Sequence, residues 1–146
     1  MYLKFINLKE FDVFILDPRL ENDSLLINEQ VNFQIRLMNV TEFFWIILIP
    51  KKTNLTELSD LNVNERNQLL NFAIDLGDHI KFIENLDKIN IGMLGNVVSQ
   101  LHLHVVIRSQ NDPAWPGPVW GWKTINKLDK ETLEYRSKVI QSFSIN

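Results

Sequence analysis

The segment that decides the fold is residues 96–108, with the sequence NVVSQLHLHVVIR. Polar and apolar residues alternate along it with a period of two, which is typical of a β-strand with one buried face. Successive side chains of a strand point to opposite faces, so Gln100, His102 and His104 are expected to share one face. The sequence therefore predicts a strand over 96–108 that presents an amide and two histidines in a row.

The two histidines of this row need an explanation. A single histidine on a strand face is usually packed or solvated without any special role. Two imidazoles two residues apart fit that explanation less well, because polar rings without partners are unfavourable in a packed environment. The third histidine, His79, lies beside Asp78 in a segment with helical spacing, so we expect it to be a surface or capping residue.

Composition limits the classes of function. The chain has 146 residues, no cysteine and a net charge of −3, which suits a single domain without disulfides. Acidic and basic residues are interspersed, so no nucleic-acid partner is expected. No apolar run is long enough to span a membrane. The first residues have no long apolar run after a basic segment, so no signal peptide is expected. We expect a cytoplasmic protein that holds a small anionic ligand through local donors.

Several segments have the composition of strands. Residues 31–38 alternate cleanly, and residues 43–49 form a β-branched and aromatic run typical of a strand buried on both sides. A short polar turn joins them, so we expect a hairpin whose second strand ends at Pro50, because proline cannot donate to the ladder. Segments 25–27, 86–94 and 96–108 complete a sheet of about five strands.

Two segments have helical spacing. Residues 64–84, after Asn62 or Asn64 as a cap, predict one long helix that covers the sheet. Residues 127–143 predict a C-terminal helix with Asp129 as its cap.

The N-terminal part of the chain has a weaker pattern. Residues 1–8 are expected to be a lead-in, with a short helix as one alternative. Asp17–Pro18 is expected to form a turn that ends segment 11–16. Segment 16–23 is too polar for the core.

The histidine row resembles the active-site strand of the histidine triad (HIT) family, in which His-x-His-x-His precedes two hydrophobic residues. His102 and His104 match the last two histidines, and Gln100 replaces the first. Asn90-Ile91-Gly92 and Gly95-Asn96 are similar to the family's phosphate loop, and Ile49-Pro50 to the end of its strand. The downstream DPAWPGPVWG, residues 112–121, looks like a bacterial branch that carries this Gln-first variant.

The resemblance implies an α+β, HIT-like fold: a mainly antiparallel sheet of about five strands, one long helix packed on it, and a C-terminal helix. The whole chain, 1–146, would be one domain with its core at about 25–110. Residues 111–146 would form a Trp- and Pro-rich loop followed by the helix. The loop is either a lid near the site or a structural wrap. The resemblance also implies that the protein is a homodimer.

The resemblance further implies a nucleotide hydrolase or nucleotidyl transferase that acts at the α-phosphate through a nucleotidyl-histidine intermediate. The nucleophile would be His102, and His104 would contact the phosphate. The substrate would be of the dinucleoside polyphosphate or phosphoramidate type, and no metal or other cofactor is expected. Five further residues are expected to bind substrate: Asn39 at the ribose hydroxyls, Asn90, Gly95 and Asn96 in the phosphate loop, and Arg108 at the end of the row.

Gln100 is the departure from the family pattern. Its amide can donate to a phosphate oxygen, but it can neither take nor deliver a proton. We therefore expect Gln100 to orient the substrate. The resemblance then assigns no residue to protonate the leaving group. Two alternatives stay open: a nucleotide-binding protein with weakened or no catalysis, and a metal site built from His102 and His104. The second is weaker because two ligands have no cysteine or acidic partner nearby.

Overall fold

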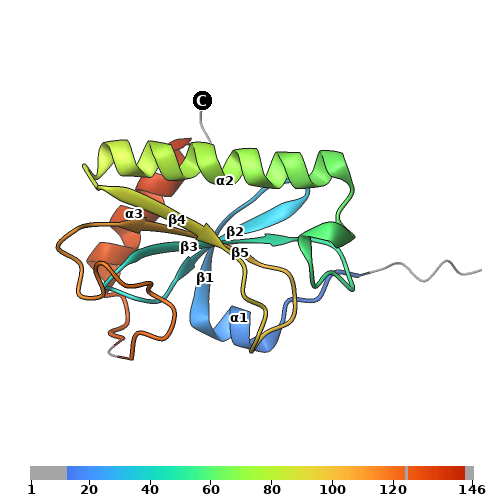
Figure 1. Ribbon diagram of the computed structural model, residues 1–146, viewed down its shortest axis with the longest axis horizontal. Helices are drawn as coiled ribbons and strands as arrows, with labels where there is room; N and C mark the ends of the chain where they lie inside the picture. Colours follow the sequence, from blue (N-terminus) through green and yellow to red (C-terminus); the bar gives the residue numbers. More distant parts are fainter. Residues whose placement is uncertain (1–12, 124, 144–146) are drawn as a thin grey trace, which may run out of the picture.

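The computed structural model describes residues 13–123 and 125–143. The lead-in expected over 1–8 lies outside these residues. Within them, an antiparallel five-stranded sheet has the order β1-β2-β3-β5-β4 and carries a long helix on one face (Figure 1). The elements in chain order are α1 (Pro18–Asp23), β1 (Ser24–Glu29), β2 (Phe33–Met38), β3 (Phe44–Pro50), a 3₁₀ turn (Leu58–Asp60), α2 (Val63–Ile83), β4 (Lys88–Gly92), β5 (Leu103–Arg108) and α3 (Lys130–Phe143). The expected α+β fold is confirmed.

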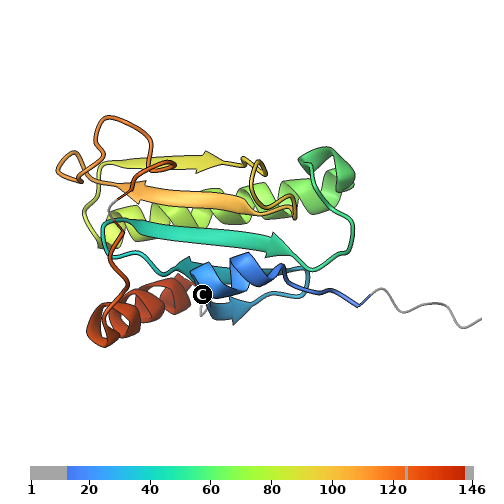
Figure 2. The ribbon, with the colours of Figure 1, turned by 90° about the horizontal axis from the view of Figure 1, so that it is seen from below.

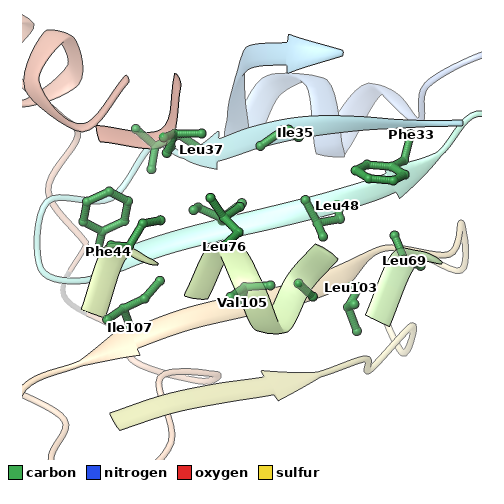
Figure 3. Close-up of a cluster of buried hydrophobic side chains, with 14 of the residues drawn as sticks. Phe33, Ile35, Leu37, Phe44, Leu48, Leu69, Leu76, Leu103, Val105 and Ile107 are labelled. Carbon is green, nitrogen blue, oxygen red and sulfur yellow. The ribbon is translucent and has the colours of Figure 1, made fainter. Parts of the chain in front are cut away.

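The two faces of the sheet have different covers. On one face α2 packs over the apolar side chains of β2, β3 and β5, which form the main core (Figure 3). On the other face, α1 and the C-terminal loop pack over Trp45, Ile47 and Ile49 of β3 and Val106 of β5. The views in Figures 1 and 2 place α1 and α2 on opposite sides of the sheet. All seven residues of β3 are buried, as expected for a central strand.

Both predicted helices form close to their expected bounds. Asn62 caps α2, and its side chain and that of Glu65 accept hydrogen bonds from each other's backbone N–H in a capping box. Gly77 lets α2 approach β4, because a Cβ at this position would lie 3.2 Å from the side chain of Ile89. Asp129 accepts a hydrogen bond from the Thr132 N–H at the start of α3, as predicted.

The expected turn at Asp17–Pro18 is wrong, because this dipeptide begins helix α1. The Asp17 carboxylate accepts from the Arg19 N–H at 2.8 Å, and proline occupies the first helical position. An aspartate before a proline suits a helix start as well as a turn. The aspartate can accept from a backbone N–H of the first turn that has no partner within the helix, and the proline occupies a position where no N–H is needed. Leu20 is buried, so the segment judged too polar does contribute to the core.

The predicted strand over 96–108 is also wrong in its first half. β5 begins at Leu103, and Asn96 to His102 form a loop. The reason is pairing: the ladder with β3 ends at Leu103 and the ladder with β4 ends at His104. β3 runs on to Pro50, but its last two residues pair with β2 alone, so neither neighbouring strand holds the residues before Leu103 in an extended row.

Candidate active site

A cavity of about 320 Å³ opens at the start of β5, within the range of about 300–1,000 Å³ common for small-molecule sites. Both histidines of the row, His102 and His104, line it. Five further segments supply the rest of the wall: α1, β2, β3, the loop after β4, and the C-terminal loop. The sheet therefore brings the histidines under a largely apolar and aromatic enclosure.

His102 is held in one tautomer by the backbone. Its Nδ1 lies 2.6 Å from the carbonyl oxygen of Gln100. A carbonyl can only accept, so Nδ1 must carry the proton. The lone pair of the neutral ring is then on Nε2, which is the arrangement a histidine nucleophile requires.

His104 is held in the opposite tautomer. The indole Nε1–H of Trp45 donates to its Nδ1 at 3.0 Å, and an indole can only donate. The ring proton of His104 is therefore on Nε2. Burial, with a further contribution from His102, lowers the pKa of His104 to about 3. His104 is thus a neutral hydrogen-bond donor at neutral pH, beside the lone pair of His102, with the two ring centres 4.7 Å apart.

Aromatic rings form the wall next to His104. Trp120 meets His104 edge-on at 5.4 Å between ring centres and meets Trp45 at 6.1 Å. Val119 and Trp122 also line the cavity. The C-terminal loop therefore supplies part of the cavity wall, one of the two roles considered for it.

The loop after β4 supplies Gly95 and Asn96 to the cavity. Gly95 has a φ of +67°, in the left-handed region that side chains other than glycine rarely adopt. This conformation turns the chain between β4 and the loop that leads to His102. Two of the three residues expected in the phosphate loop, Gly95 and Asn96, thus line the same cavity as the histidines.

The side chain of Gln100 lies outside the cavity of the two histidines, although its backbone carbonyl contacts His102. Its Oε1 accepts from the Asp17 N–H at 2.8 Å, and its Nε2 donates to the Ile15 carbonyl at 2.9 Å. The Gln100 side chain lines a different cavity, beside the N-terminal segment. The expectation that Gln100 shares a strand face with His102 fails because both residues precede β5.

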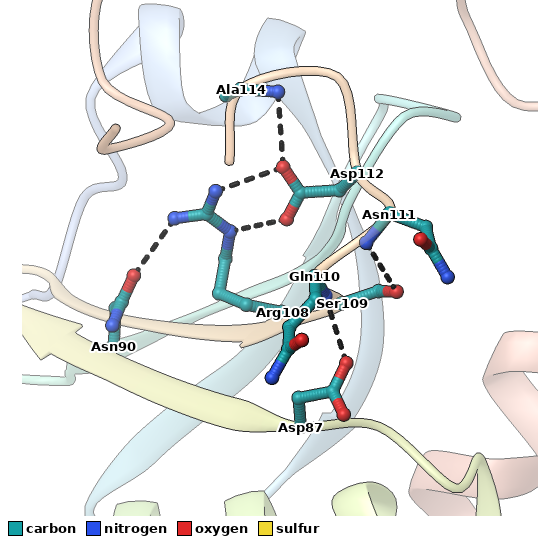
Figure 4. Close-up of polar contacts among 8 residues, drawn as sticks. All are labelled: Asp87, Asn90, Arg108, Ser109, Gln110, Asn111, Asp112 and Ala114. Carbon is teal, nitrogen blue, oxygen red and sulfur yellow. Dashed lines mark hydrogen bonds and ion pairs between the residues drawn. The ribbon is translucent and has the colours of Figure 1, made fainter. Parts of the chain in front are cut away.

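Arg108 and Asn90 form a polar cluster beyond the cavity. The Arg108 guanidinium donates to both carboxylate oxygens of Asp112, at 2.6 and 2.9 Å, and to Asn90 Oδ1 at 2.9 Å (Figure 4). It is 1% exposed and lies against the rings of Phe43 and Trp115. Neither Arg108 nor Asn90 lines the cavity, and these contacts give both residues structural partners.

Asn39 also has a structural partner. Its Oδ1 accepts from the Leu128 N–H at 3.0 Å, and the residue lines a neighbouring cavity. An acidic residue, Asp23 at the end of α1, lines the cavity of the two histidines. Sequence reasoning missed Asp23 because it took Asp17–Pro18 for a turn. If the same dipeptide had been interpreted as a helix start, the sequence would have predicted a helix that includes Asp23.

In the part of the chain that the structure describes, no cluster of three or more His, Asp or Glu side chains could hold a metal ion. None of the helices in those same residues is long and apolar enough to cross a membrane.

The comparison with protein families identifies the family of this chain. The model described as "HIT domain" matches residues 19–111. The chain belongs to the HIT family. No curated protein matches it.

Solved structures of HIT proteins support this placement. A histidine triad protein from Sinorhizobium meliloti is 36% identical, with a TM-score of 0.85 over 88% of this chain and 96% of the other. A histidine triad protein from Marinobacter aquaeolei is 34% identical, with a TM-score of 0.86 over 90% and 96%. One from Bradyrhizobium japonicum is 28% identical, with a TM-score of 0.85 over 89% and 97%. The HIT relatives therefore match this chain over nearly their whole length.

Proposed function

We propose that this protein is a nucleotide hydrolase or nucleotidyl transferase that acts at an α-phosphate, with His102 as the nucleophile. The observation that carries the proposal is the pair of opposite tautomers. The carbonyl of Gln100 leaves the His102 Nε2 lone pair free, and Trp45 leaves the His104 Nε2–H as a donor. A nucleophile beside a neutral donor suits attack on a phosphorus whose oxygens gain charge.

The reaction has two steps. Nε2 of His102 attacks the α-phosphorus, the bond to the leaving group breaks, and a nucleotidyl-imidazole forms. The leaving group keeps the electron pair and takes a proton from solvent. Water then attacks the same phosphorus and loses a proton to solvent, and the P–Nε2 bond breaks. The nucleoside monophosphate is released and Nε2 of His102 regains its lone pair. In a transferase, an acceptor hydroxyl takes the place of water.

The cavity chemistry favours a substrate with little negative charge. Among the described residues that line it, the charged one is Asp23, a carboxylate. A carboxylate can accept both hydroxyls of a ribose but repels a polyphosphate chain. We therefore favour a nucleoside phosphoramidate, or a similar substrate with a single phosphate group, over a dinucleoside polyphosphate. Gly95 and Asn96 are proposed to contact the phosphate, and the apolar wall to accept the base.

The test is a substrate screen with wild type and His102→Ala. Adenosine and guanosine phosphoramidates, diadenosine tetraphosphate and a nucleotide sugar are compared, and a substrate labelled at the α-phosphate is used to trap the intermediate. We expect turnover of a phosphoramidate and a labelled protein that His102→Ala abolishes. His79→Ala is the matched control, because His79 contacts Ser142 on the far side of the sheet. Equal turnover by His102→Ala would refute the assignment.

A second candidate is a nucleotide-binding protein without turnover. The observation that favours it is that Gln100 replaces the first histidine and that its side chain bonds to backbone groups, so this position supplies no acid for the leaving group. This candidate predicts that the protein binds a nucleoside monophosphate, shows no labelled intermediate, and turns over none of the substrates.

A further inference from the structure

We propose that Gln100 is a positioning residue: it ties the N-terminal segment to the peptide that holds His102 in its reactive tautomer. The inference rests on the proposed function only in taking His102 as the nucleophile. It assigns Gln100 a role that does not involve contact with the substrate.

The side chain of Gln100 pairs with the backbone as a strand would. Its Oε1 accepts from the Asp17 N–H at 2.8 Å and its Nε2 donates to the Ile15 carbonyl at 2.9 Å. This double contact needs an acceptor and a donor side by side on one group, which a carboxamide provides. Glutamate keeps the acceptor and loses the donor, and alanine loses both.

The main chain of Gln100 is fixed on two sides. Its carbonyl accepts from Nδ1 of His102 at 2.6 Å. The N–H at the other end of the same peptide, on Leu101, donates to the Leu55 carbonyl at 2.9 Å. With the side chain also anchored, three contacts fix this peptide, and its carbonyl is the group that decides where the His102 proton resides.

The same segment builds the wall of the cavity. Asp17, which Gln100 binds through its N–H, caps α1 through its carboxylate, and α1 supplies Leu20 and Asp23 to the cavity. Arg19 of α1 donates to the Val97 carbonyl at 3.1 Å, a second link between α1 and the loop before His102. Loss of the Gln100 contacts should therefore loosen the nucleophile and the wall together.

The experiment measures the imidazole directly and needs no substrate. Long-range ¹H–¹⁵N NMR spectra of the histidine rings give the tautomer of His102 in wild type, Gln100→Ala, Gln100→Glu and Ser99→Ala. Amide hydrogen exchange at Asp17 is followed in the same proteins. Ser99→Ala is the matched control, a truncation in the same loop at a side chain that makes none of these contacts.

We expect the wild type and Ser99→Ala to hold the Nδ1–H form of His102. In Gln100→Ala and Gln100→Glu, the ratio of Nδ1–H to Nε2–H should fall about 2- to 10-fold, the effect of one lost hydrogen bond. Exchange at Asp17 should rise by a similar factor in Gln100→Ala, and by less in Gln100→Glu, whose carboxylate can still accept from the Asp17 N–H. If Gln100→Ala does not fold, the isosteric Gln100→Glu variant carries the test.

Two results would overturn the proposal. One is an unchanged His102 tautomer together with unchanged Asp17 exchange in both Gln100 variants. The other is a large loss of turnover with wild-type tautomer and exchange, which would mean that the amide contacts the substrate. If no substrate is ever turned over but the NMR changes occur, the proposed function fails and the positioning role stands.

Discussion

The hydrogen bond from Trp45 to His104 decides which nitrogen of His104 carries its proton. Trp45→Phe keeps an aromatic ring against His104 and Trp120 and removes the Nε1–H donor. His104 could then place its proton on Nδ1 and lose the donor that faces the phosphate. Losing such a donor costs up to about 10²–10³-fold in turnover, and we expect a loss of up to about 10²-fold on a phosphoramidate. Trp115→Phe, the same replacement beside Arg108, should stay close to wild type, and equal losses in both variants would contradict this role.

The low pKa of His104 predicts how stability depends on pH. The pKa falls from 6.5 to about 3 on folding because of burial and the nearby His102. Between these values the unfolded chain binds a proton that the folded protein does not, so stability falls as pH decreases from about 6.5 toward 3. The slope from this one group is at most about 1.4 kcal/mol per pH unit.

The measurement is Tm against pH, from 7 to 4, for wild type and His104→Phe. The variant cannot titrate, so its Tm should fall less steeply with acid, although the unpaired Trp45 N–H lowers its Tm at pH 7. Parallel curves for the two proteins would show that His104 does not contribute to acid lability.

At the scale of elements, the clamp between Arg108 and Asp112 joins the end of β5 to the C-terminal loop. Both side chains are almost fully buried, at 1% and 6% exposure. Burial alone would raise the pKa of Asp112, but the hydrogen bond and charge of Arg108 and the backbone N–H groups of Ala114 and Trp115 outweigh it, so the pKa is lowered. The carboxylate is therefore the form that holds the loop.

Asp112→Ala leaves the Arg108 charge buried without its ion-pair partner. Breaking a buried pair in this way costs about 3–5 kcal/mol, and we expect a loss of that order in the free energy of unfolding by urea. Glu134→Ala is the control, because its contact with Lys130 is 3.9 Å long and exposed. A loss as small as that of the control would mean that the aromatic rings of Phe43 and Trp115, and not the ion pair, hold Arg108.

The sequence predicted those elements whose limits depend on local signals. Residues 43–49 and 64–84 carry continuous patterns with a proline and an asparagine at their ends, and β3 and α2 match them closely. The start of β5 was mispredicted because it depends on where the hydrogen-bonded ladders with β3 and β4 end, which the local sequence pattern does not indicate. His102 and His104 were found from their spacing. The hydrogen bond from Trp45 to His104 was not predicted, because it depends on the register between β3 and β5, in which Ile47 pairs with His104.

At the scale of the whole molecule, the β4 edge of the sheet is a candidate surface for association. β4 is an edge strand, and exposed apolar side chains lie on it, in the loop that follows and on α2: Ile91, Met93, Leu94 and Ile74. α2 packs directly beside β4. An unpaired edge next to exposed apolar residues favours association with another chain. We therefore expect a homodimer formed across β4 and α2, as the resemblance to HIT-like proteins first implied.

The variant that tests this dimer is Ile91→Asp, which puts a charge on β4 at a side chain that is 38% exposed. A buried unpaired carboxylate is costly at an interface but tolerable on a free surface, so the change should split the dimer while leaving the monomer folded. Leu26→Asp on the opposite edge strand, at 49% exposure, is the matched control and should stay dimeric. Light scattering at micromolar concentration gives the mass, and circular dichroism checks the fold. A monomeric wild type, or equal masses for wild type and Ile91→Asp, would exclude this interface, whereas dissociation of Leu26→Asp alone would move it to β1.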